Sequence, residues 1–252
     1  MNPYVQNLNR IEFLVTLACS GHCKHCSEGS HHSAGEHIDG DVAAEMVRRT
    51  AENYNIESLM TFGGEPLLYP EEVCKIQAAA RDMNIPKRQL ITNGFFSRNA
   101  EKIQKVAQML AESGVNAILL SVDAFHQETI PLESVMVFAK AVLATDIPSL
   151  RVHPAWLVNE AADNLYNRKT REILEEFRSL GITASDGNVI FPSGNALKYL
   201  KEYFDPDAPV INPYTEDPKD IRAICVSPDG DVLDGNIYKT DILEILGNYV
   251  PA

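Results

Sequence analysis

The sequence of 252 residues has few cysteines, few basic residues and no long hydrophobic run. A membrane-spanning helix needs about 18 or more consecutive apolar residues, and no stretch of the sequence approaches that length. The N-terminal residues Met1 to Tyr4 also lack the charged region and the apolar region that begin a signal peptide. We therefore expect a cytoplasmic protein without a membrane partner.

Basic side chains are outnumbered: 22 lysines and arginines stand against 35 aspartates and glutamates, which gives a formal net charge of -13. Proteins that bind a nucleic-acid backbone neutralise its phosphates with basic surface. We therefore expect no nucleic-acid partner.

Only five cysteines are present, and three of them lie within residues 19–26. An odd number with this clustering does not predict a disulfide framework, which agrees with a reducing compartment. Cys19, Cys23 and Cys26 form a C-x3-C-x2-C array directly after the apolar run 11–17. Three thiolates on one short loop can bind a single metal centre.

Two kinds of metal centre fit this loop. Zinc structural sites are closed sets of four ligands, and His22, His25, His31 and His32 are available as a fourth donor. A [4Fe-4S] cluster held by three thiolates instead leaves one iron open for a substrate or cofactor. Zinc pairs usually recur as a second C-x2-C, which the sequence lacks, so the spacing favours the cluster.

Predicted strands and helices alternate along most of the chain. The strands are 10–17, 56–62, 89–92, 116–122, 150–158 and 188–191, and the helices between them are 41–54, 70–83, 100–113, 133–144 and 170–180. Such a right-handed series predicts an α/β fold with a parallel sheet. Because about six units fall short of the eight that close a TIM barrel, we expect a partial (β/α)6 TIM-like barrel, open on one side.

Residues 198–252 break this alternation. Four prolines make residues 204–218 a linker or surface loop. Pro228, Asp229 and Gly230 separate two β-rich runs within residues 223–233, which predicts a β-hairpin because Asp-Gly supplies the positive φ of a tight turn. We expect residues 1–197 to form the partial barrel and residues 198–252 to form an extension of the same compact unit, its hairpin against the open side.

Further motifs follow successive predicted strands: Gly-Gly-Glu-Pro at 63–66, Thr-Asn-Gly at 92–94 and Ser-Val-Asp at 121–123. In this order, after the cysteine array, they resemble the radical S-adenosylmethionine (radical SAM) superfamily over roughly residues 9 to 195. One departure is His25, which stands before the third cysteine, where the family usually has a larger aromatic residue.

The resemblance implies that Cys19, Cys23 and Cys26 hold one [4Fe-4S] cluster and that its fourth iron binds S-adenosylmethionine (SAM). Reductive cleavage would give a 5′-deoxyadenosyl radical that abstracts hydrogen from a substrate, with electrons from a low-potential donor such as flavodoxin or ferredoxin. We expect the other cofactor-binding residues at strand ends: Gly63, Gly64 and Glu65, with Glu65 accepting from the methionyl ammonium, and Asn93, Ser121, Asp123, His153 and Ser193.

Two residues are candidates for catalysis. His126 follows the fourth strand and is a possible base or substrate contact, although structural packing also explains a histidine there. Cys225 is a possible hydrogen-atom donor to a substrate radical, as in radical SAM peptide epimerases; a buried structural thiol is the alternative.

The predicted hairpin, opened by a cysteine, resembles the C-terminal extension of peptide-modifying radical SAM enzymes. We therefore expect a peptide or peptide-like substrate and a modification such as epimerisation or crosslinking. A small metabolite is a second possibility, and a zinc-stabilised binding protein a third. Only Cys74 and Cys225 remain outside the array, so we expect no auxiliary cluster. About nine residues precede the first strand, so we expect a peptide to bind without an N-terminal recognition arm.

Overall fold

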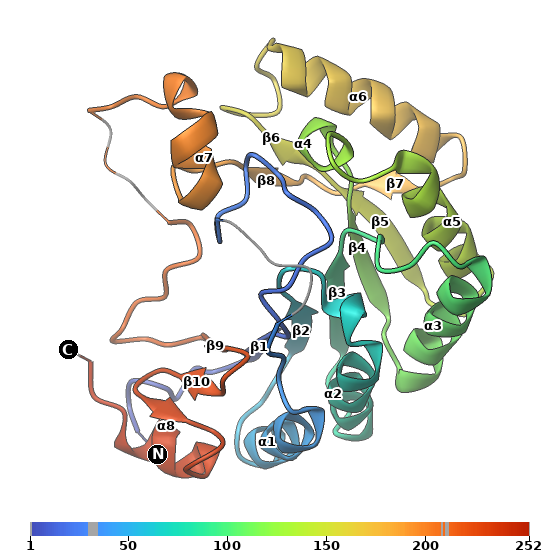
Figure 1. Ribbon diagram of the computed structural model, residues 1–252. Helices are drawn as coiled ribbons and strands as arrows, with labels where there is room; N and C mark the ends of the chain where they lie inside the picture. Colours follow the sequence, from blue (N-terminus) through green and yellow to red (C-terminus); the bar gives the residue numbers. More distant parts are fainter. Residues whose placement is uncertain (1, 30–34, 208, 210–211, 252) are drawn as a thin grey trace.

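A seven-stranded parallel sheet forms the centre of the protein (Figure 1). The computed structural model describes residues 2–29, 35–207, 209 and 212–251, so His31 and His32 lie outside the described residues. The order is β7-β5-β4-β3-β2-β1-β9, and every neighbouring pair is parallel. The strands are β1 (Arg10–Leu14), β2 (Ser58–Phe62), β3 (Lys87–Thr92), β4 (Ala117–Ser121), β5 (Ser149–His153), β7 (Thr183–Ala184) and β9 (Ala223–Val226).

Long helices cover the outer face of the sheet (Figure 1). They are α1 (Gly40–Asn53), α2 (Pro70–Asp82), α3 (Ala100–Ser113), α5 (Leu132–Leu143) and α6 (Leu165–Arg178). In the described residues β7 and β9 end the sheet without pairing with each other. The protein is thus an α/β, TIM-like partial barrel that is open on one side, as the alternation predicts.

The alternation of side chains along the strands separates a core from a concave face. In β1, Ile11 and Phe13 are fully buried and join the apolar core with the helices, whereas Arg10, Glu12 and Leu14 are only partly buried. Because successive side chains of a strand point to opposite faces, these three face the inside of the partial barrel. The inside is therefore partly polar and accessible.

The predicted strand 188–191 is present in part, but it does not join the main sheet as the sixth strand. The strand that pairs with β5 is β7, whereas β8 (Asn188–Val189) pairs with β6 (Ala155–Trp156) in a separate small sheet. The cause lies in the predicted strand 150–158, which Pro154 divides into β5 and β6. Proline has no N–H to donate to a ladder, so the two halves separate and choose different partners.

The predicted hairpin is also placed wrongly. The turn exists, because Gly230 has a φ of 87° and its N–H donates to the carbonyl of Ser227 at 3.0 Å. However, β9 pairs with β1, and β10 (Asp231–Val232) pairs antiparallel with β11 (Gly235–Asn236). The reason is that β9 can form a longer hydrogen-bonded ladder with the free edge of β1 than with β10, the short strand beyond the turn.

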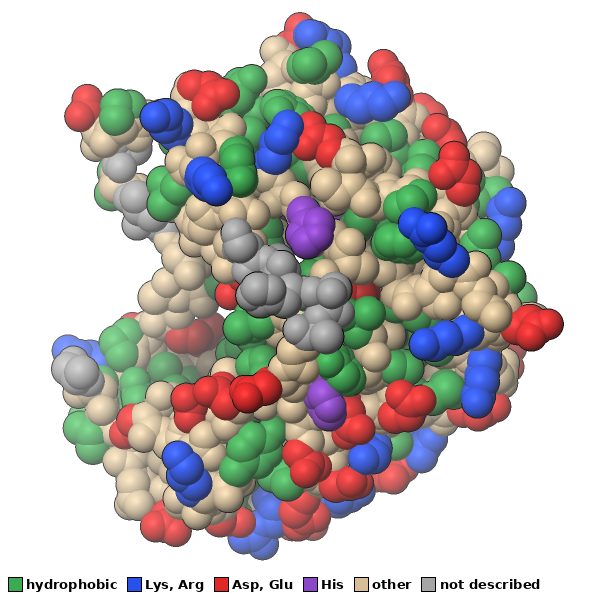
Figure 2. Space-filling model, viewed as in Figure 1, with side chains coloured by type: hydrophobic (Ala, Val, Ile, Leu, Met, Phe, Trp, Pro, Cys, Tyr) green, Lys and Arg blue, Asp and Glu red, His purple; other side chains and the backbone are tan. Residues whose placement is uncertain are grey.

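Short elements complete the chain. They are η1 (Pro66–Leu68), α4 (Ala124–Gln127), α7 (Gly194–Tyr199), η2 (Lys201–Tyr203) and α8 (Ile242–Asn248). Figure 2 shows a hollow between the region of α8, β9 and β10 and the region of α7, on the open side of the sheet. No helix of the described chain is long and apolar enough to cross a membrane.

Candidate functional site

The cysteine loop follows β1 at the carboxyl edge of the sheet, where catalytic groups of parallel α/β barrels gather. Cys19 and Cys23 are buried and Cys26 is partly buried, and the three thiols lie close enough to influence one another electrostatically. Burial raises the pKa of Cys19 to about 11 and the pKa of Cys23 further. Thiols in such a setting release a proton when they bind a metal.

Gly63 and Gly64 lie against the segment that enters the loop. The N–H of Gly64 donates to the carbonyl of Thr16 and the N–H of Glu65 to the carbonyl of Ala18, both at 2.8 Å. A Cβ at Gly64 would come within 2.2 Å of the Ala18 oxygen, and Gly63 has a φ of 141°. Both positions therefore require glycine for packing of the loop, whatever they contact in a cofactor.

Glu65 is fully buried and connects two strand ends. Its Oε1 accepts from the N–H of Leu67 at 2.9 Å and from the hydroxyl of Thr92 at 2.7 Å, and its Oε2 accepts from the N–H of Asn93 at 2.8 Å. Burial raises the pKa of Glu65 to about 7, although these donors oppose the change. Since a carboxylate has about four acceptor positions, one position on Oε2 remains for a further donor.

Asn93 contacts the cysteine loop directly. Its Nδ2 lies 3.6 Å from the Sγ atom of Cys19 and 3.3 Å from the hydroxyl of Ser20. Its Oδ1 accepts from the N–H of Phe95 at 2.8 Å, which fixes the side chain. Asn93 therefore donates to a thiol that is expected to bind metal.

Asp123 is fully buried and holds the start of α4. Its Oδ1 accepts from the N–H groups of Phe125 and His126, and its Oδ2 accepts from the N–H of Ala155 and contacts Nδ1 of His126 at 2.7 Å. Burial alone would raise the pKa of Asp123, but the His126 ring outweighs it and holds that pKa well below its usual range. Protein donors thus use the acceptor positions of this carboxylate.

His25 packs against the same short helix. Its ring centroid lies 5.1 Å from that of Phe125 and 4.7 Å from that of His126. Desolvation lowers the pKa of His25 to about 4, so the ring is neutral near pH 7. The histidine therefore occupies an aromatic packing position, as a planar ring can.

Ser193 and the two residues after it dock onto the cysteine loop. The hydroxyl of Ser193 donates to the carbonyl of Ser27 at 3.1 Å. Nδ2 of Asn195 donates to the carbonyls of Cys23 at 3.1 Å and Gly29 at 3.0 Å, and its N–H donates to the carbonyl of Cys26 at 2.9 Å. This turn therefore fixes the shape of the loop.

The remaining predicted residues are divided between two parts of the sheet. Ser121 and His153 are paired neighbours at the ends of β4 and β5, and Nδ1 of His153 contacts the hydroxyl of Ser185 at 2.7 Å. Cys225 is exposed on β9 and is paired with Glu12 of β1, so it lies toward the opposite edge of the sheet.

Sequence reasoning missed two residues. Asn195 lies two residues after the predicted Ser193, and its position in the sequence gives no sign that its side chain reaches back to the cysteine loop. Arg151 lies two residues before His153 on β5 and so shares its face. Its spacing of two residues from His153, within a predicted strand, was the sequence signal that could have placed Arg151 on the same face as His153.

These features define a metal-binding α/β partial barrel with three thiols on one strand-end loop. The family model of the radical SAM superfamily matches residues 13–195, and the chain belongs to that family. No curated protein sequence matches.

Solved structures with the same fold include three informative ones. Native anSMEcpe with bound AdoMet is 16% identical, with a TM-score of 0.59, over 95% of this chain and 80% of that chain. SuiB from Streptococcus suis, bound to the precursor peptide SuiA, is 12% identical, with a TM-score of 0.52; the match covers 97% of this chain and 65% of SuiB. BtrN in complex with AdoMet and 2-DOIA is 16% identical, with a TM-score of 0.51; the match covers 96% of this chain and 82% of BtrN. At these identities the likeness shows the fold.

The residues present fit the cofactors of the family, which are a [4Fe-4S] cluster and SAM. Cys19, Cys23 and Cys26 supply three thiols from one loop, and thiolates are the ligands that such clusters take. Asn93 supplies a hydrogen bond to one sulfur, and such bonds are part of how proteins tune clusters.

Proposed function

We propose that this protein is a radical SAM enzyme that abstracts hydrogen from a peptide or peptide-like substrate, in a modification such as epimerisation or crosslinking. The observation that carries the proposal is the three-thiol loop, which is held by glycine packing where the chain enters it and by Asn195 at Cys23. The cluster with SAM would supply a 5′-deoxyadenosyl radical after reduction by a low-potential donor such as flavodoxin or ferredoxin.

Glu65 and Asn93 are the side chains that would bind the cofactor nearest the loop. The free acceptor position on Oε2 of Glu65 suits an ammonium group, which would form a charge-assisted hydrogen bond there. Asn93 is held by Phe95 and donates to Cys19, so it would position the loop against the cofactor. Gly63 and Gly64 would keep the loop close to the strand end.

Ser121, Arg151 and His153 would bind polar groups of the cofactor or the substrate. All three lie on the concave face of neighbouring strands, in register. Arg151 suits a carboxylate because its planar guanidinium can donate two parallel hydrogen bonds. Asp123 has its acceptor positions in use, so it would position His126, which would serve as the base or substrate contact.

Two observations support a peptide substrate. The partial barrel is open on one side and hollowed there (Figure 2), which gives a chain room to enter. Solved relatives in fold include SuiB with its precursor peptide and anSMEcpe with a Cp18Cys peptide. The second candidate, a small metabolite, is favoured by the likeness to BtrN, whose structure holds 2-DOIA.

The test is a turnover assay under anaerobic reducing conditions. The reconstituted protein is supplied with SAM and with peptides encoded beside its gene, and 5′-deoxyadenosine and modified peptide are measured. The peptide proposal predicts that 5′-deoxyadenosine forms faster with one peptide and that deuterium from that peptide enters it. If a small metabolite speeds the formation of 5′-deoxyadenosine and no peptide does, the result would support the second candidate.

A further inference from the structure

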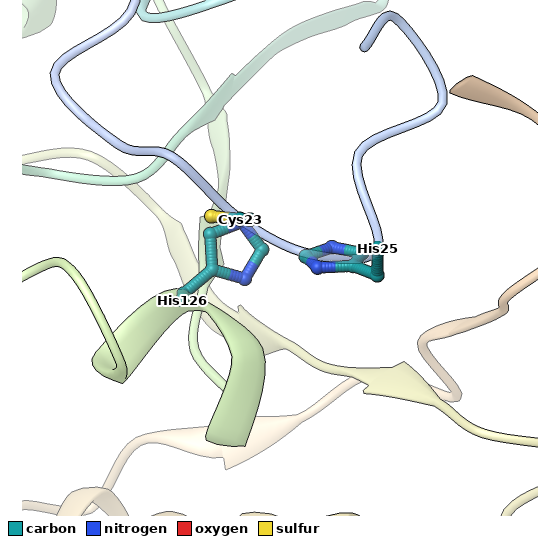
Figure 3. Close-up of side chains that lie close together, drawn as sticks. All are labelled: Cys23, His25 and His126. Carbon is teal, nitrogen blue, oxygen red and sulfur yellow. The ribbon is translucent and has the colours of Figure 1, made fainter. Parts of the chain in front are cut away.

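A second set of metal donors overlaps the cysteine loop. Among the described residues, Cys23, His25 and His126 each offer a ligand atom, and these atoms lie within 4.8 Å of one another. Figure 3 shows the three side chains lying close together, with Cys23 and His25 on the loop and His126 on α4. Cys19 and Cys26 do not belong to this group.

The nitrogen atoms of this set are suited to bind an ion. Nδ1 of His25 is buried and has no hydrogen-bond partner within the described part of the chain. Such an atom is costly to leave unpaired. Nδ1 of His126 contacts Asp123 at 2.7 Å, which leaves Nε2 as the nitrogen that can bind metal. A carboxylate behind a histidine is the usual arrangement around protein-bound zinc.

The charge and the donor types favour zinc. One thiolate and two neutral imidazoles beside the Asp123 carboxylate would balance a divalent ion. Sulfur and nitrogen donors are those that zinc takes, with three protein ligands leaving an open fourth position. Such donors also bind Zn²⁺ more tightly than Fe²⁺.

We propose that, before a cluster is assembled, Cys23, His25 and His126 bind one zinc ion with a fourth position open to water. This site goes beyond the proposed function and does not depend on it. It also differs from a zinc site made by the loop alone, because its ligand His126 comes from α4. His22 of the loop is exposed and is not one of the ligands. Because a cluster and this zinc ion both need Cys23, the two cannot be bound together.

The test is anaerobic titration of the reduced, metal-free full chain with Co²⁺, a spectroscopic substitute for zinc, followed by competition with Zn²⁺. We expect one tetrahedral Co²⁺ per chain with a charge-transfer band of one thiolate. His126→Gln should weaken binding by about tenfold or more, since changes even behind the ligands cost about 10–100-fold. His25→Phe, which keeps a planar ring against Phe125, should do the same. Cys26→Ser should bind Co²⁺ as the native chain does.

Circular dichroism of each variant separates loss of a ligand from loss of the fold. If His126→Gln does not fold, the Co²⁺ affinity of His25→Phe alone tests the proposal. The proposal is overturned if the band has the intensity of three thiolates, if Cys26→Ser weakens binding as much as His25→Phe, or if the native chain binds no Co²⁺. Failure of the radical SAM assay would leave this result unchanged, because the titration requires neither iron nor SAM.

Discussion

Nδ2 of Asn195 donates a hydrogen bond to the carbonyl oxygen of Cys23 at 3.1 Å, across 172 positions of sequence. A second bond from the same amide reaches the carbonyl of Gly29 at 3.0 Å. These contacts hold the later part of the loop, whereas Gly63 and Gly64 pack against residues 15–18, where the chain enters it. The loop is therefore held between the end of β2 and the start of α7.

Asn195→Ala removes both side-chain bonds. At about 1 kcal/mol for each bond, the loop should lose roughly 2 kcal/mol of its stability and release its cluster to a chelator faster than the native protein. Iron release followed by absorbance measures this rate. Asn53→Ala is the matched control, since Asn53 is exposed at the end of α1 and its side-chain amide donates to the carbonyl of Arg49 within the same helix. Equal rates for both variants would show that Asn195 does not hold the loop.

Asp123→Asn and His126→Gln should lower turnover to a similar degree, because Asp123 acts by holding His126 at 2.7 Å. The double variant should then be little worse than either single one, as for residues that act as a unit. Turnover and SAM binding are measured for all three. Losses that multiply in the double variant would mean that the two side chains act separately.

Glu65 predicts a pH dependence of stability. The folded protein holds the Glu65 proton more tightly than the unfolded chain, because burial raises its pKa from 4.5 to about 7. Its contribution therefore favours folding at low pH and is lost as the pH rises from about 4.5 to about 7, by about 3 kcal/mol.

Denaturant unfolding of the cofactor-free protein at several pH values tests this dependence. Glu65→Gln cannot ionise, so its stability should fall less than that of the native protein over the same pH interval. The comparison uses slopes against pH, since the amide also changes one hydrogen bond to Asn93. Parallel slopes would place the Glu65 pKa near its ordinary value.

Cys225 is exposed and lies on β9 beside Glu12. If its thiol returns a hydrogen atom to the substrate radical, product formed in D₂O should carry deuterium at the reacting carbon. Cys225→Ala should lower this incorporation, and Cys74→Ala, on the outer helix α2, should not. Mass spectrometry of the product gives the answer. Unchanged product from Cys225→Ala would remove the donor role.

Much of the fold could be predicted because local signals agreed with the final packing. Helix α3 runs over 100–113 as predicted, since Asn99 caps its first turn and Gly114, with a φ of 91°, ends it. The strand-end motifs come together because parallel strands bring their carboxyl ends to one edge. Family membership followed from those same motifs.

The errors arose where partners far away in sequence decided the structure. Pro154 breaks the predicted strand 150–158, but only the tertiary pairing shows that β7 takes the place in the main sheet. Asn195 and Arg151 could not be ranked from sequence, because a loop contact or a position on the concave face depends on neighbouring strands and turns. The pairing of β9 with β1 likewise joins segments far apart in the sequence, so it could not be predicted from local signals.

The central claim is that Cys19, Cys23 and Cys26 hold a cluster with one iron available to SAM. The most direct measurement is the electron paramagnetic resonance spectrum of the anaerobically reconstituted, reduced protein before and after SAM is added. We expect about four irons per chain, a spectrum that changes with SAM, and loss of both in Cys26→Ala. A cluster spectrum that stays the same when SAM is added would contradict the account.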